Sequence, residues 1–172
     1  MTLLAVTVIG HDRPGIIAET TRLLAGLGAN LEDSSMTILR GHFAMVLLAS
    51  ADAGATEVEQ ALGSLTDDGE LSVSVRAVPD ESSHPPEGPT YLLSVHGGDR
   101  PGIVSALTAQ VATVNGNITD LSTRLSGDLY VLLAELELPP MVDVGALSDR
   151  LSAVAESLGV RASLRPVDPD LL

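Results

Sequence analysis

The sequence of 172 residues has no cysteine, no tryptophan and no lysine, and aromatic residues make up only 2% of it. Without cysteine the chain can form no disulfide, hold no metal through thiolates and use no cysteine nucleophile. With so few aromatic residues, any core must consist of leucine, valine, isoleucine, alanine and methionine. No apolar run approaches the ~18 residues of a membrane span.

The charge of the chain is strongly one-sided. Nine arginines face 23 acidic residues, which gives a formal net charge of −14. Such a surface repels phosphate backbones, so we expect no direct nucleic-acid binding and no membrane association. The apolar residues 1–10 lack a basic segment before them and predict a strand rather than a signal peptide, as in a soluble cytoplasmic protein.

An internal repeat organises the sequence. The octet GHDRPGII at residues 10–17 returns as GGDRPGIV at residues 97–104, and the same shift places Asn30 on Asn117 and Phe43 on Tyr130. A fixed period of this kind indicates duplicated structural units. We therefore predict one domain at residues 1–78 and a second at 90–167, joined by a proline-rich linker at 79–89 and followed by a loosely held tail at 168–172.

Hydrophobic periodicity predicts the same order of elements in both copies. In the first copy a strand over 3–9 precedes a helix, strands over 30–39 and 43–49 follow, and a strand over 71–78 comes last. The first helix of each copy carries an apolar stripe: Ile16, Ile17, Leu23, Leu24 and Leu27, or Ile103, Val104, Leu107, Val111 and Val114. Gly28 and Gly116 follow these helices, where glycine ends a helix well. The second helix is clearest in the later copy, at Leu147, Leu151, Val154 and Leu158.

The resulting order, β-α-β-β-α-β twice, predicts an α+β protein of two ferredoxin-like domains. Each would have an antiparallel four-stranded sheet with two helices on one face. The strands FAMVLLA and YVLLAEL are apolar on both sides, so we expect the open face or an edge of the sheet to pack against another copy. Strand 31–39 is either an ordinary solvent-facing edge or an edge that pairs with 118–126 or with another chain.

The octet has two interpretations. Proline suits the first position of a helix, so Pro14 predicts a helix start whose free amides at Gly15, Ile16 and Ile17 would bind a carboxylate. Asp12 would then hold an ammonium group, and Asn30 of a paired module would add donors and an acceptor, so that the site would lie at a module interface. The alternative is that the octet is only a favourable helix start, with Asp12 near the N-cap.

Other kinds of site find little support in the sequence. The four histidines show no i, i+4 helical spacing, which argues against a metal site. Phosphate-binding loops, dinucleotide fingerprints and the GxSxG elbow are absent too. We expect no cofactor and no enzymatic activity.

The DRPGI phrase after a strand, followed by GANL or NGNI at the start of the next strand, resembles the ACT domain in both copies. This resemblance implies the ferredoxin-like fold, amino-acid binding and, for tandem modules without a catalytic domain, transcriptional control of amino-acid metabolism such as that of glycine through a partner protein. The ligand-binding positions it implies are His11, Asp12, Gly15, Ile16 and Asn30, and Gly98, Asp99, Gly102, Ile103 and Asn117. Glycine stands at 98 where the first copy has histidine, so the copies need not bind alike. Two functions remain open: an amino-acid sensor, which we expect to form a homodimer, and a dimerising adaptor without a live site.

Overall fold

The computed structural model describes residues 1–79 and 88–167. The chain divides into two compact units, Met1–Ser82 and Ser83–Leu172. Most of the predicted linker, residues 80–87, and the predicted tail, residues 168–172, lie outside the described residues. The domain boundaries therefore stay a prediction.

Each unit has the predicted order of elements. The first contains β1 (Thr2–His11), α1 (Ile16–Gly26), β2 (Asn30–Leu39), β3 (His42–Ala51), α2 (Ala55–Ala61), a 3-10 helix η1 (Leu62–Thr66) and β4 (Leu71–Ala77). The second contains β5 (Thr90–Gly98), α3 (Ile103–Ala112), β6 (Asn117–Ser126), β7 (Leu129–Glu137), α4 (Val144–Ser157) and β8 (Val160–Pro166).

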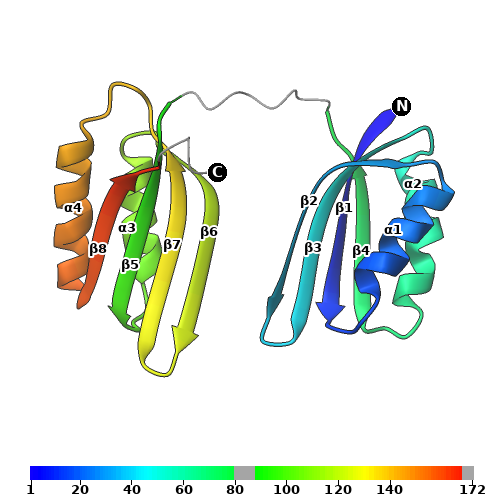
Figure 1. The fold of residues 1–172 in the computed structure, drawn as a ribbon, viewed down its shortest axis with the longest axis horizontal. Helices are drawn as coiled ribbons and strands as arrows, with labels where there is room; N and C mark the ends of the chain where they lie inside the picture. The colour runs from blue at the N-terminus through cyan, green and yellow to red at the C-terminus, as the bar shows by residue number, and fades with distance from the viewer. Residues whose placement is uncertain (80–87, 168–172) are drawn as a thin grey trace. The chain divides into compact units, whose positions relative to one another are not determined.

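The strand order is β2-β3-β1-β4 in the first sheet and β6-β7-β5-β8 in the second, and all neighbours are antiparallel. The helices of each unit cover one face of its sheet, as Figure 1 shows. This arrangement confirms the predicted pair of ferredoxin-like domains. The strands β2 and β6 are edges, and no described helix of the same unit covers the sheet face opposite the helices, which we call the open face.

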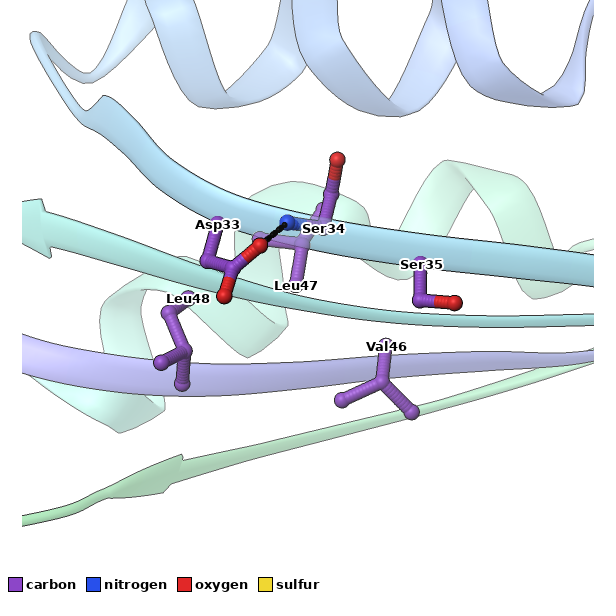
Figure 2. Close-up of a pocket in the computed structure, with 6 residues that line it drawn as sticks. All are labelled: Asp33, Ser34, Ser35, Val46, Leu47 and Leu48. Carbon is purple, nitrogen blue, oxygen red and sulfur yellow. Dashed lines mark hydrogen bonds between the residues drawn. The ribbon is translucent and has the colours of Figure 1, made fainter. Parts of the chain in front are cut away.

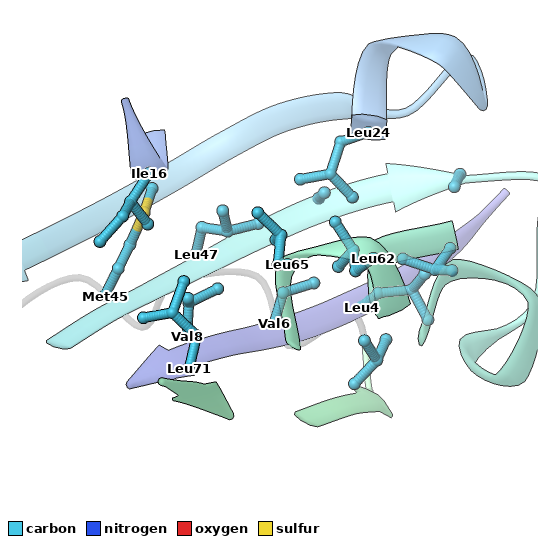
Figure 3. Close-up of a cluster of buried hydrophobic side chains, with 14 of the residues drawn as sticks. Leu4, Val6, Val8, Ile16, Leu24, Met45, Leu47, Leu62, Leu65 and Leu71 are labelled. Atoms are coloured by element: carbon cyan, nitrogen blue, oxygen red, sulfur yellow. The ribbon is translucent and has the colours of Figure 1, made fainter. Parts of the chain in front are cut away.

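The core of each unit lies between its sheet and its helices. In the first unit it is aliphatic except for Phe43 and Met45, and Figure 3 shows it between β1, β3 and the helices: Leu4, Val6, Val8, Ile16, Leu24, Met45, Leu47, Leu62, Leu65 and Leu71. Full burial of each such side chain contributes roughly 1.5–3 kcal/mol. Many buried aliphatic side chains thus supply the stabilisation that large aromatic residues contribute in other cores.

The buried face of α1 differs from the predicted stripe at one position. Ile17 is 43% exposed, whereas Thr20 is fully buried. Its hydroxyl donates a hydrogen bond to the Ile16 carbonyl oxygen at 2.8 Å, which satisfies the polar group inside the core. The prediction for Ile17 was wrong because a helix buries positions three or four apart, and Ile16, Thr20 and Leu24 already occupy that face.

The helix ends also differ between the copies. Gly28 follows α1 with φ 69°, the left-handed conformation that favours glycine. After α3 this conformation belongs to Asn115, with φ 54°, and not to Gly116. A Cβ at Gly116 would lie 2.8 Å from side-chain atoms of Leu138 and Val111, so close packing explains this glycine. No helix among the described residues is long and apolar enough to cross a membrane.

Candidate functional site

The octet of the first unit begins at the end of β1, where three segments meet. The His11 amide donates to the Glu70 carbonyl oxygen at 3.0 Å, and the Asp12 amide donates to the Gly41 carbonyl oxygen at 2.9 Å. A Cβ on Gly10 would lie 2.0 Å from the Glu70 oxygen, so only glycine fits there. The turn is therefore fixed to the β2–β3 hairpin tip and to the segment before β4.

The two helices that follow the octets begin at Ile16 and Ile103. Their N-caps are Gly15, with φ 94°, and Gly102, with φ 93°. The prediction that Pro14 takes the first helical position was wrong, because a proline followed by a left-handed glycine forms a turn before the helix. The first helical residues are Ile16 and Ile103, and their side chains are buried in the cores.

No side chain caps either helix start. The first intrahelical bonds run from the Glu19 and Ala106 amides to the Gly15 and Gly102 carbonyl oxygens, at 2.9 Å each. The amides before them have no partner within the helix. Nothing lies within 4 Å of a Cβ built on Gly15, so the space in front of this helix start is open. Asp12 thus forms no capping hydrogen bond with α1, and the alternative that the octet is only a helix start stays open.

An arginine in each octet distinguishes the two turns. Arg13 forms ion pairs with Glu19 at 3.2 Å and with Asp68 at 3.9 Å, and is about one-third exposed. At the position of Glu19 the second unit has Ala106, and no ion pair of Arg100 occurs within the described residues. The Arg100 guanidinium lies 3.4 Å from a Cβ built on Gly159. An anion at the second turn would therefore meet an arginine that no carboxylate neutralises. The predicted site residues include neither arginine, although the DRPG motif contains both.

A tyrosine adds a polar group beside the second octet. Tyr130 pairs with Gly97 across β5 and β7, where the first unit has buried Phe43 beside Gly10. Burial raises the pKa of the Tyr130 phenol above its ordinary value of 10.0; a hydrogen bond with Thr123 opposes the rise and the charge of Asp99 adds to it. The phenol is thus protonated at neutral pH and close to Asp99.

The asparagines lie at the other end of each sheet. Asn30 pairs with Ser50, which pairs with Leu3 of β1, whereas the octet starts at Gly10. At ~3.3 Å per residue the stretch from Leu3 to Gly10 spans about 23 Å. Asn117 and the second octet are separated in the same way, since Asn117 pairs with Glu137 opposite Thr90. No single unit brings its asparagine to its own octet, as Figure 1 lets the reader follow for β1 and β2.

The sheet of the first unit carries a hollow away from the octet. It measures about 270 Å³ and is lined by Asp33, Ser34, Ser35, Val46, Leu47 and Leu48, which Figure 2 shows on β2 and β3. Within residues 1–79 and 88–167, no three histidine or acidic side chains are grouped as metal ligands. The two candidate binding surfaces considered among the described residues are therefore the octet turns and the sheet faces.

Comparison with known proteins identifies the repeated unit. A family model for the ACT domain matches residues 2–76 and again residues 90–164. The chain belongs to the ACT domain family. Its two ACT domains account for the duplicated octet and for the repeated β-α-β-β-α-β order.

Several relatives share parts or all of this tandem ACT arrangement. The chain is 25% identical to the glycine cleavage system transcriptional repressor of Escherichia coli, over 96% of this chain and 90% of that protein. A UPF0237 protein of Methanopyrus kandleri is 58% identical over 28% of this chain, and that match spans only about half of the relative, 53%.

Two solved structures share the tandem ACT fold over nearly the whole chain. A protein of unknown function from Galdieria sulphuraria has a TM-score of 0.80 at 32% identity, covering 97% of this chain and 99% of that one. A putative glycine cleavage system transcriptional repressor has a TM-score of 0.73 at 22% identity, covering 97% and 98%. The ACT domains and the similarity to a repressor support a regulatory role.

Proposed function

We propose that this tandem ACT protein is a non-enzymatic regulator that binds a small amino acid and passes its occupancy to a partner protein. Transcriptional control of glycine metabolism is the first candidate process, because the Escherichia coli relative is named a glycine cleavage system transcriptional repressor. Action through a partner protein agrees with the net charge of −14, because so acidic a surface repels the phosphates of DNA.

One observation carries this proposal: each octet ends in a left-handed glycine that starts a helix with no side-chain cap. Free amides at the positive end of a helix attract a carboxylate. Asp12 and Asp99 stand in the same turns and carry the charge that an ammonium group requires. The ligand is therefore a zwitterion, and the class of small amino acids fits.

The strand register adds a requirement to the proposed amino-acid site. Because Asn30 and Asn117 lie about 23 Å or more from the octets of their own units, they serve the site only if another module supplies them. Antiparallel pairing of the edge strands β2 or β6 with another such edge would bring the start of one strand beside the octet of the other module. The expected site thus lies where two modules pair.

Thermal unfolding with a panel of free amino acids tests the proposal. A ligand that binds only the folded protein raises the melting temperature, and the stabilisation grows with the logarithm of its concentration once that concentration exceeds Kd. Asp12→Ala combined with Asp99→Ala should abolish the shift, whereas Asp149→Ala, on the exposed surface of α4, should preserve it. If no amino acid shifts the wild-type protein, the sensor proposal fails.

The adaptor alternative rests on the large apolar side chains exposed on both sheets, such as Val46 at 50% and Leu133 at 41%. Surfaces of this kind mark contacts with other proteins. In this alternative the module pairs with a partner but has no live ligand site. Asp12→Ala and Asn30→Ala would then leave partner binding unchanged with and without amino acids.

A further inference from the structure

The middle of the open face of the first sheet is ordered in three rows of side chains, and the register continues with Leu39, His42 and His11 at one end and with Ser50 and Leu3 at the other. Strand register places directly paired residues side by side, and alternate residues point away from the helices. From β2 through β3 and β1 to β4 the rows are Thr37, Ala44, Ile9, Ser72; then Ser35, Val46, Thr7, Ser74; then Asp33, Leu48, Ala5, Arg76. Figure 2 shows Val46 and Leu48 on the side of the sheet away from the helix.

The chemistry of these rows is unusual for the surface of so acidic a chain. Ile9 is 51% exposed and Val46 is 50% exposed. The only charged members of the three rows are Asp33 and Arg76, which stand at opposite edges of one row. These three rows are mostly small or apolar, with one charge at each edge, and so have the composition of a protein contact surface.

A two-fold axis parallel to the strands makes this face complementary to itself. Such an axis lays each row on the same row of a second copy and reverses the strand order, so that β2 faces β4 and β3 faces β1. Leu48 then faces Ala5 of the second copy, and Ile9 faces its Ala44. Large side chains thus meet small ones in both rows.

The same two-fold rotation also pairs the charged side chains of the two copies. Asp33 faces Arg76 of the second copy, and by symmetry the pair forms twice. One Asp33 carboxylate oxygen accepts a hydrogen bond from the Ser34 amide at 2.8 Å, which holds the carboxylate in place. An axis across the strands would instead lay Asp33 on Thr37 and Arg76 on Ser72, and would leave both charges unpaired.

We propose that this face packs on the same face of a second copy about an axis parallel to the strands, and so forms a symmetric dimer. Face-to-face sheets lie about 10 Å apart with their strands within about 30°. The Arg76 side chain is long enough to reach the Asp33 carboxylate of the second copy across this spacing and angle. The inference does not depend on amino-acid binding.

The second unit offers an internal comparison. Its rows are Arg124, Val131, His96, Arg161; then Ser122, Leu133, Ser94, Ser163; then Asp120, Glu135, Leu92, Arg165. The same axis would pair Asp120 with Arg165, as in the first sheet, but it would also lay Arg124 on Arg161 twice and place Glu135 against Leu92. Like charges in direct opposition disfavour this association. Self-complementarity is therefore a property of the first sheet.

The size of the face sets the strength of the dimer. Four strands at ~4.8 Å spacing and about six residues at ~3.3 Å, the length that the three rows span, give roughly 400 Å² per copy. Stable interfaces commonly bury about 800 Å² per partner. We therefore expect a reversible dimer whose population depends on protein concentration.

Charge reversal tests the inference in the full-length protein. Sedimentation equilibrium from micromolar to sub-millimolar concentrations should show that Asp33→Arg and Arg76→Asp each weaken dimerisation by about tenfold or more, because each variant opposes like charges twice. The double variant should recover dimerisation, because it exchanges the two charges. Asp120→Arg and Arg165→Asp, at the equivalent positions of the second sheet, should leave dimerisation unchanged.

Three outcomes would overturn the inference: a wild-type protein that stays monomeric throughout, a dimer that neither single variant weakens, or a double variant that fails to recover. The last two would assign the dimer to another surface, such as a paired edge strand. Circular dichroism of each variant verifies that the fold persists, since both side chains are exposed and lie outside the cores.

Discussion

Single residues make the two octet turns different, although the repeat gives them nearly the same sequence. Arg13 is engaged by two carboxylates, whereas Arg100 has none within the described residues. Tyr130 replaces the buried Phe43 and brings a phenol close to Asp99. The second turn therefore combines an unneutralised arginine with a protonated phenol. If the proposed amino-acid binding holds, we expect the two turns to bind with different affinities.

The raised pKa of Tyr130 has a consequence for stability. In the folded state the phenol holds its proton more tightly than in the unfolded state, so its contribution is fully present below the ordinary pKa of 10.0 and is lost as pH rises through the folded value. Tyr130→Phe removes this contribution. Urea unfolding at a series of alkaline pH values should show a steeper fall in unfolding free energy for the wild type than for the variant. Parallel curves would show that folding does not perturb this phenol.

The helices of this protein differ in how their first turns are capped. The Asp143 carboxylate caps α4 by accepting a hydrogen bond from the Ala146 amide at 3.0 Å. The helices α1 and α3 begin at left-handed glycines and have no side-chain cap. The helix α2 also begins without a side-chain cap, at Gly54 in an extended conformation, so the left-handed glycine rather than the missing cap sets the two octet helices apart.

This contrast gives a prediction for two aspartates. Asp143→Ala should lower the free energy of unfolding by about 1 kcal/mol, because α4 loses its cap. Asp12→Ala should change it by less than about 0.5 kcal/mol, because Asp12 caps no helix. Urea unfolding of both variants measures the difference. An equal loss from the two substitutions would restore a structural role for Asp12 at the start of α1.

Sequence patterns predicted the elements well and the site only in part. The repeat and the periodicity fixed the order of strands and helices, because apolar spacing reports which face of an element is buried. They misplaced the start of α1, since Pro14 and Gly15 suit either a first turn of helix or a turn before it. They also gave no distance between Asn30 and the octet. That distance depends on strand register, which joins residues far apart in the chain.

Charge is distributed unevenly over the whole molecule. The net charge is −14, yet Arg124, Arg161 and Arg165 lie on the open face of the second sheet. Asp120 and Glu135 stand on the same face. If the proposed transcriptional role holds, the protein acts by one of two routes: contact with DNA through these arginines, or contact with a protein that binds DNA.

The overall charge decides between these routes. A protein holds duplex DNA by neutralising several phosphates with clustered basic residues, and three arginines among neighbouring acids on a strongly acidic chain fall short of that. We expect no mobility shift of duplex DNA at about 0.15 M salt, with or without amino acids. A shift that weakened steeply with salt and vanished in the Arg124→Ala, Arg161→Ala double variant would contradict this. It would make the second sheet a DNA-contacting surface and remove the need for a partner protein.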